Sequence, residues 1–309
     1  MEKQKLKIHF YSETQIPKGF IMSEKNFFEP QQSINISGKL MDLSLPKVMA
    51  ILNVTPDSFY SNSRTKSIDD ALTKTEAFLK EGATFIDIGG YSSRPGAIDI
   101  SATEESDRLI PVVESLVKEF PEVVISVDTF RAKVAEETIL AGAQIINDIS
   151  AGDLDQHMFE TVARLQVPYM IMHMQGTPQN MHQNPTYQNV TLDVIDYLAK
   201  KIAALKALHI HDVIIDPGFG FGKTIEHNYE LLQNLDAFKI FKLPVLVGFS
   251  RKGMIYKALQ TTAAEALNGT TILNTIALQK GAGILRVHDV REAMECIQLI
   301  SRLNSSIVH

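Results

Sequence analysis

From about Val48 to the C-terminus, short apolar runs alternate with amphipathic stretches, and this alternation limits the folds open to the chain. The runs resemble buried parallel strands, and the stretches between them carry apolar residues at helical spacing. The expected strands lie near residues 48–52, 84–88, 123–127, 144–146, 168–172, 212–215, 244–248 and 283–286. The expected helices lie near residues 68–79, 104–120, 132–141, 159–165, 192–208, 227–238, 264–280 and 290–303. A doubly wound open sheet would show the same alternation, but about eight units over roughly 250 residues favour a TIM (β/α)8 barrel.

Six polar residues stand at or shortly after the ends of the expected strands: Asn53, Asp128, Asn147, Asp216, Lys252 and Arg286. Because the carboxyl ends of barrel strands surround one mouth, we expect these side chains to converge on a site there. Other roles remain open. Asp216 could start a turn with Pro217, Asp128 could cap the next helix, and Asn147 could cap a loop. Lys252 and Arg286 could be solvated charges.

Some segments do not fit the strand–helix repeat. Residues 1–33 show neither period, and we expect a poorly ordered N-terminal extension followed by a catalytic domain over 34–309. The domain should open with a hairpin over 34–45 that plugs the bottom of the barrel; Met1 and Met22 are both possible translation starts. Three connections that follow strands, 55–65, 91–101 and 175–187, are longer than ordinary βα loops, and we expect lids there.

Composition narrows the class of protein. The net charge of -6 argues against a nucleic-acid binder. The single cysteine, Cys296, excludes an intramolecular disulfide and a cysteine-based zinc site, and it fits a reducing cytoplasm. No apolar run reaches the length of a membrane span, and residues 1–10 lack the core of a signal peptide. We therefore expect a cytoplasmic protein without membrane or nucleic-acid partners.

A glycine-rich segment from Asp216 to Thr224 looks like a phosphate loop but departs from that motif. Pro217 occupies the position at which a Walker A motif needs glycine, and the glycine spacing also misses the dinucleotide fingerprint. We expect instead that the glycines let the backbone bend close to a flat ligand, with Phe219 or Phe221 lining it.

Five segments together resemble the dihydropteroate synthase family, in the family's order and over about residue 34 to the C-terminus. They are Ile51 to Phe59, Asp87 to Gly96, Asp216 to Thr224, Ser250 to Lys252, and Arg286 to Asp289. The resemblance implies a TIM barrel that joins a 6-hydroxymethyl-7,8-dihydropterin pyrophosphate to 4-aminobenzoate, giving 7,8-dihydropteroate and pyrophosphate in folate biosynthesis. It also implies an SN1-like route, Mg²⁺, sensitivity to sulfonamides and a homodimer.

The resemblance and the chemistry of the residues together suggest roles. Asp128, Lys252 and Arg286 are expected to be catalytic, and Asn53 to be a neutral oxygen ligand for Mg²⁺. The pterin is expected to contact Asp128, Asn147, Met172, Asp216, Phe221 and Lys252. Pyrophosphate and 4-aminobenzoate are expected to contact Asn53, Phe59, Ser93, Arg94, Pro95, Gly253, Arg286 and His288, with Arg286 and His288 clamping the pyrophosphate.

The chain also departs from the family's motifs. Residues 60–63 read Tyr-Ser-Asn-Ser where the family has Ser-Asp-Gly-Gly, and Tyr91 and Ser93 replace Glu and Thr. Gly253 replaces a serine whose hydroxyl is expected to bind the benzoate carboxylate, although a helix start there would still offer backbone donors and a dipole. Two alternatives share the barrel: the pterin-binding domain of a corrinoid-linked methyltransferase, and a non-catalytic pterin-binding module. The former would not need the segments at 250–252 and 286–288, and the latter could lose Asn53.

Overall fold

The computed structural model describes residues 31–54, 64–92, 99–181 and 183–305 of the chain. Eight parallel strands form one sheet in the order β8-β7-β6-β5-β4-β3-β10-β9. A parallel bridge between Ile215 and Val245 joins the two ends of that order, so the sheet closes into a barrel. The strands are β3 Lys47–Asn53, β4 Phe85–Gly89, β5 Val124–Asp128, β6 Ile145–Asp148, β7 Tyr169–Met172, β8 Val213–Asp216, β9 Leu246–Val247 and β10 Ile284–Val287. The expected TIM barrel is confirmed.

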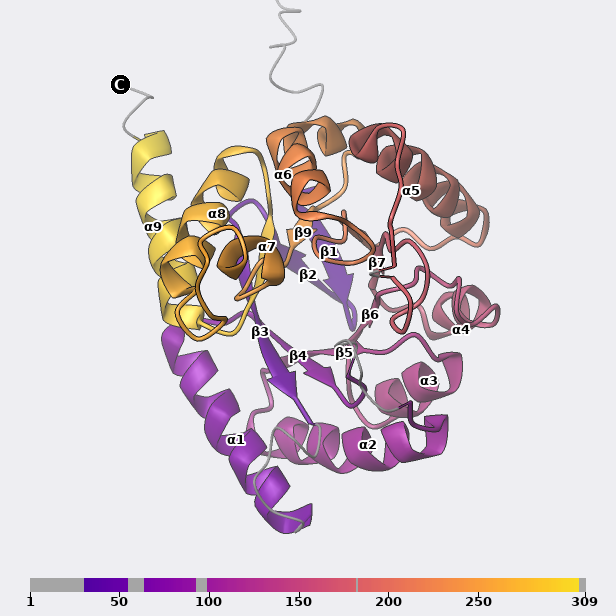
Figure 1. Ribbon diagram of the computed structural model, residues 1–309. Coiled ribbons are helices and arrows are strands. Elements are labelled where there is room, and N and C mark those ends of the chain that lie inside the picture. Colours follow the sequence, from indigo (N-terminus) through magenta and orange to yellow (C-terminus); the bar gives the residue numbers. More distant parts are fainter. Residues whose placement is uncertain (1–30, 55–63, 93–98, 182, 306–309) are drawn as a thin grey trace, which may run out of the picture.

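Helices surround the strands as an outer ring (Figure 1). They are α1 Arg64–Glu81, α2 Ala102–Glu119, α3 Ala132–Leu140, α4 Met158–Leu165, α5 Val190–Ala207, α6 Ile225–Gln233, the 3-10 helix η3 Leu235–Phe241, α7 Gly253–Tyr256, α8 Leu267–Gln279 and α9 Val290–Ser305. The single helix expected over 227–238 is in fact two elements, α6 and η3, which meet at Asn234. No helix in the described ranges is both long and apolar enough to cross a membrane.

The expected hairpin is present as β1 Ser33–Ile36 and β2 Lys39–Asp42, paired antiparallel. It lies at the amino-terminal end of the barrel, where Ile34, Ile36 and Leu43 join an apolar cluster inside the strands. The other buried members come from seven of the eight strands: Met49, Phe85, Ile145, Met170, Ile214, Leu246 and Ile284. The hairpin therefore closes the bottom of the barrel.

Strand alternation places the polar residues above this apolar layer. Successive side chains of a strand point to opposite faces, so a residue two positions after an inward residue also points inward. Asn147 follows inward Ile145, and Asp216 follows inward Ile214. The outward residues, such as Ile146 and Ile215, belong instead to the large cluster between strands and helices. The interior of the barrel is therefore apolar near the amino-terminal ends of the strands and polar near their carboxyl-terminal ends. We call the second region the polar upper interior.

Candidate active site

Arg286 is the central cation of the polar upper interior. Its Nε donates to Asp87 Oδ2 at 2.6 Å, and its Nη2 donates to Asp128 Oδ2 at 2.7 Å. Asp87 Oδ2 also accepts a hydrogen bond of 3.1 Å from Asn147 Nδ2. Residues from β4, β5, β6 and β10 are therefore tied into one network, which explains why these strand ends carry polar groups.

Asp87 has a role that the sequence reasoning did not assign. It lies within β4 and is 0% exposed, although it belongs to the second family-like segment. The available signal was a lone carboxylate in an apolar strand, two residues after inward Phe85, because a fully buried charge needs a partner. That partner is Arg286, which was expected to clamp pyrophosphate. Arg286 is held by two carboxylates, and its side chain is 17% exposed.

Burial and charge act against each other in this network. Burial raises the pKa of Asp128 above its usual value, and Asp87 adds to this shift while Arg286 opposes it. For Arg286, burial opposes the charge, but Asp87 and Asp128 raise the pKa of the guanidinium well above its usual value. Asp128 is not a helix cap, because α3 begins at Ala132 with Arg131 as its N-cap residue.

Asp216 lies at the end of β8 and faces Lys252 from the segment after β9. Asp216 Oδ1 accepts a hydrogen bond of 2.7 Å from the Gly218 amide, so the residue does start the turn that its sequence allowed. Burial raises the pKa of Asp216, and Lys252 opposes that shift. Burial likewise lowers the pKa of Lys252 to about 8, with Asp216 opposing. The buried Asp216 and the half-buried Lys252 therefore lie close enough to stabilise each other's charge.

An apolar wall stands beside these charges. Met172, Ile149, Met174 and Met181 form a separate buried cluster, against which Phe130, Leu154 and Phe221 pack. Lys252 Nζ lies 4.6 Å from the centroid of the Phe221 ring. A flat ring held between an apolar face and hydrogen-bonding groups is suited to a heteroaromatic ligand. Met172 and Phe221, both expected at the pterin, are in this wall.

The segments after β9 and β10 are tied together. Ser250 Oγ lies 2.9 Å from His288 Nδ1 and accepts from the His288 amide at 3.1 Å. Arg251 donates to both carboxylate oxygens of Asp289, from Nε and from Nη2, each at 2.9 Å. Helix α7, which begins at Gly253, has only four residues. It is too short for the dipole that the sequence suggested there.

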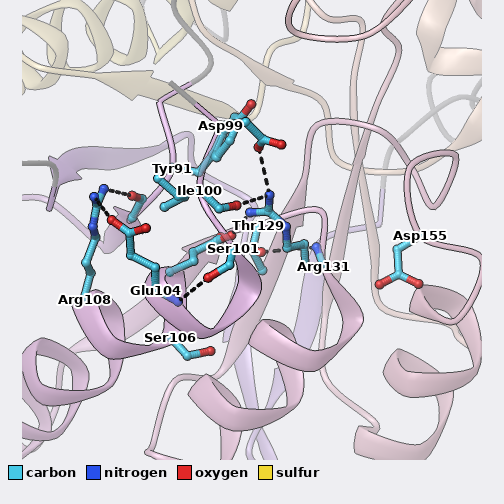
Figure 2. Close-up of polar contacts among 12 residues, drawn as sticks. Tyr91, Asp99, Ile100, Ser101, Glu104, Ser106, Arg108, Thr129, Arg131 and Asp155 are labelled. Carbon is cyan, nitrogen blue, oxygen red and sulfur yellow. Dashed lines mark hydrogen bonds and ion pairs between the residues drawn. The ribbon is translucent and has the colours of Figure 1, made fainter. Parts of the chain in front are cut away.

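The rim of the mouth is anchored by Arg131, between β5 and α3 (Figure 2). Its guanidinium pairs with the fully buried carboxylate of Glu105 on α2 and donates to Ile100 O at 2.7 Å. It also lies over the ring of Tyr91, 5.2 Å from the centroid. Arg131 thus holds both described ends of the connection between β4 and α2. Ser93, Arg94 and Pro95 of that connection, and Phe59 of an earlier one, lie outside the described residues.

Asn53 is half-buried at the end of β3. A Cβ added to Gly89 would lie 3.8 Å from Asn53 Oδ1 and 3.9 Å from Asp128 Oδ2, so both oxygens flank the same small space. Within the described ranges no group of three or more His, Cys, Asp or Glu side chains could hold a metal. An amide oxygen suits Mg²⁺ that keeps water and phosphate oxygens as its other ligands.

Comparison with known proteins gives a consistent result. Residues 49–288 match the family described as pterin binding enzymes. The dihydropteroate synthase of Escherichia coli strain K12 is 44% identical over 265 residues, which covers 85% of this chain and 93% of that protein. The dihydropteroate synthase of Haemophilus influenzae is 44% identical, with 85% and 96% covered.

Solved structures agree. A Yersinia pestis dihydropteroate synthase with a sulfonamide drug complex superposes with a TM-score of 0.82 at 41% identity, covering 88% of this chain and 99% of that one. The Xanthomonas albilineans dihydropteroate synthase with 4-aminobenzoic acid gives 0.81 at 35% identity, covering 89% and 99%. Sequence and fold therefore point to the same group of enzymes.

Proposed function

Because this chain belongs to the dihydropteroate synthase family of folate-synthesis transferases, we propose how its barrel mouth joins a 6-hydroxymethyl-7,8-dihydropterin pyrophosphate to 4-aminobenzoate. The observation that carries the proposal is the meeting of charges of opposite sign in one desolvated mouth. Burial lowers the pKa of Lys252, Asp216 and Asp128 oppose that shift, and Arg286 adds to it. All three charged groups therefore act on the same ammonium. Such a set can bind a polar flat ring and also stabilise charge that develops on it.

The pterin is bound at its donor–acceptor edge. Asp216 Oδ1 is committed to the turn, so Oδ2 accepts from the amino-pyrimidine N–H groups of the ring. The side-chain amide of Asn147 is oriented by the hydrogen bond that its Nδ2 donates to Asp87. Asn147 contributes the remaining polar contacts to the pterin. Lys252 donates to the ring's carbonyl side, and Met172 with Phe221 covers the face. A hydrogen-bonding site of this kind rejects rings that leave its buried groups unpaired.

The chemistry begins with cleavage of the bond between the methylene carbon and the pyrophosphate oxygen. The electron pair leaves with pyrophosphate, and positive charge spreads from the methylene into the ring. The Asp128 carboxylate lies at the mouth and stabilises that charge. The arylamine nitrogen of 4-aminobenzoate then forms the new C–N bond and loses one proton to water. Asp128 is therefore expected to act on the transition state more than on binding.

The leaving group is held by Arg286, His288 and the side chain of Asn53. Arg286 uses Nε and Nη2 for its carboxylates, and a guanidinium has five N–H donors, so others can contact pyrophosphate. His288 is oriented by Ser250 and completes the clamp. Asn53 would hold Mg²⁺ together with pyrophosphate oxygens, and the bound ion would neutralise part of the leaving group's charge.

Three broader statements extend the proposal. We propose a homodimer, supported by Ile272 of α8 and Leu299 of α9, which are 50% and 71% exposed large apolar residues on two packed helices. We propose a cytoplasmic location, supported by the buried free thiol of Cys296.

We also propose an ordered binding of substrates, in which 4-aminobenzoate binds after the pterin substrate, or after pyrophosphate with Mg²⁺. Tight calorimetric binding of 4-aminobenzoate to metal-free enzyme alone would contradict that order.

An isotope experiment tests the ionisation step. The pterin substrate is prepared with ¹⁸O in the bridging C–O–P position and incubated with enzyme and Mg²⁺ without 4-aminobenzoate. If the bond ionises first, the label should move into non-bridging positions of recovered substrate, and Asp128→Asn should slow this movement. Product formation at full rate from substrate that shows no such movement would indicate a concerted displacement instead.

A further inference from the structure

The loop Gly218–Gly222 after β8 has three residues with positive φ angles, and all three are glycines. Gly218, Gly220 and Gly222 have φ angles of 75°, 84° and 60°, in the left-handed region that costs other residues energy. A Cβ on Gly218 would lie 1.9 Å from the His173 carbonyl oxygen. The loop is therefore pressed against the end of β7, and its carbonyl groups turn toward different sides.

Lys223 fills the inner side of this loop. Its side chain is buried, and Nζ donates to Gly218 O at 2.8 Å and to Phe221 O at 3.1 Å. His173 Nδ1 lies 3.0 Å from the same Nζ. Burial lowers the pKa of His173 to about 3, and Lys223 adds to that shift, so the ring is a neutral acceptor. His173 O lies a little farther away, at 3.3 Å, and also accepts from Nζ. The three N–H donors of the ammonium are therefore all used within the protein.

Lys252 holds the same loop from the side of the mouth. Its Nζ donates to Phe219 O at 2.7 Å and faces the Phe221 ring. The carbonyls of Gly218 and Phe221 thus turn inward to Lys223, while the carbonyl between them turns outward to Lys252. Two ammonium groups on opposite sides fix one loop, and that loop begins two residues after Asp216.

This geometry excludes the phosphate-loop interpretation for Lys223. In a P-loop the lysine reaches the β- and γ-phosphates, whereas Lys223 Nζ points into the interior and contacts backbone carbonyls. Burial lowers the pKa of Lys223 to about 7, with Asp216 opposing the shift. The desolvation of this amine is compensated by carbonyl dipoles and not by a ligand.

We infer that Lys223 is a positioning residue for the pterin site: it holds the loop Gly218–Gly222 so that Phe221 and Lys252 face the pocket of Asp216. It does not touch the substrate. The inference rests on the roles proposed above for Asp216, Phe221 and Lys252. It also accounts for a lysine and three glycines that neither ATP binding nor dinucleotide binding explains.

Equilibrium binding of 6-hydroxymethylpterin provides the test. The chain has no tryptophan, so the fluorescence of the pterin can be followed without protein interference. Lys223→Met keeps the length of the side chain and removes the ammonium. We expect its pterin Kd to rise about tenfold or more, since hydrogen bonds of a charged group are lost behind the loop. Lys280→Met is the matched control, because Lys280 lies at the end of α8, on the amino-terminal side of the barrel, donates to Gln233 O at 2.7 Å and has a 24% exposed side chain.

A double-mutant cycle separates positioning from general destabilisation. If Lys223 acts through the loop that Lys252 also holds, Lys223→Met should weaken pterin binding by less than about threefold in a Lys252→Met background. Equal fold-changes in both backgrounds, an unchanged Kd for Lys223→Met, or the same loss in Lys280→Met would overturn the inference. Where Lys223→Met does not fold, Lys223→Gln, which keeps one donor, undergoes the same comparisons. A wild-type enzyme that fails to bind the pterin would instead refute the proposed site itself.

Discussion

The buried carboxylate of Asp87 offers the sharpest test of how the site is held together. Asp87→Asn preserves the shape of the side chain and one acceptor oxygen for Asn147, but it removes the charge that faces Arg286 and places an amide nitrogen where the buried Asp87 Oδ1 has no partner. Breaking a buried ion pair by removing one partner costs about 3–5 kcal/mol. Arg286 keeps Asp128 as a second partner and its side chain is 17% exposed, so we discount the loss in unfolding free energy to about 2–3 kcal/mol.

The same substitution should also affect the reaction. Arg286 loses one of its two charged partners, and small misplacements of catalytic groups are costly, so kcat/KM for the pterin substrate should fall about tenfold or more. Urea unfolding followed by circular dichroism gives the stability change, read as a shift in midpoint at constant slope. Steady-state pyrophosphate release gives the kinetic change.

Glu105→Gln provides the matched control. Glu105 is another fully buried carboxylate paired with an arginine, Arg131, but it lies at the rim and not in the Arg286 network. We expect a similar loss of stability with a pterin Kd that changes by less than about twofold. The reasoning would be refuted if Asp87→Asn retained its urea midpoint and its pterin affinity, or if Glu105→Gln weakened pterin binding equally.

Four further predictions follow from the same geometry. Asp216→Ala should weaken pterin binding by roughly 2–4 kcal/mol in fluorescence titration, because the ligand's donors lose their acceptor; binding within a factor of two would contradict the assignment. Asp128→Asn should lower kcat more than it changes the pterin Kd, so a pure affinity effect would show that the roles are misassigned. Gly253→Ser should tighten 4-aminobenzoate by about 0.5–1.5 kcal/mol in steady-state KM measurements, since a Cβ there would have its nearest neighbours, Lys257 Cε and Tyr256 Oη, at 3.6 Å; an unchanged KM would mean that backbone amides alone hold the carboxylate. Because the pKa of Lys252 is lowered to about 8, its ammonium is present below that pH and lost above it, so kcat/KM for the pterin substrate should fall as the pH rises through about 8; a profile flat to pH 10 would argue against a charged Lys252 in binding.

The strands and the strand-end residues could be predicted from the sequence for a clear physical reason. A parallel barrel strand is buried on both faces, so it appears as a continuous apolar run, and a polar residue at its end stands out. Asn147 and Asp216 were found in this way. Asp87 was not, because it lies inside such a run and its partner Arg286 is distant in the sequence. Only the barrel places β4 and β10 on either side of β3, where their side chains face one interior.

The orientation of side chains could not be predicted from motifs alone. The Gly-Lys pair at 222–223 resembles the end of a phosphate loop, but the sequence did not indicate a direction for the Lys223 side chain. Lys223 faces inward, and its direction depends on the left-handed glycines before it. The contact between His173 and Lys223 depends on the approach of two segments that are 50 residues apart in the sequence. The four-residue length of α7 was likewise not visible in the pattern. These features depend on tertiary contacts, so the spacing of apolar residues along the sequence does not reveal them.

Pyrophosphate release measured with both substrates and Mg²⁺ tests the central claim most directly. The purified chain should release pyrophosphate and form 7,8-dihydropteroate in equal amounts, with release dependent on the pterin pyrophosphate and suppressed in Asp216→Ala. A folded protein that binds the pterin but releases no pyrophosphate with 4-aminobenzoate and Mg²⁺ present would contradict the account.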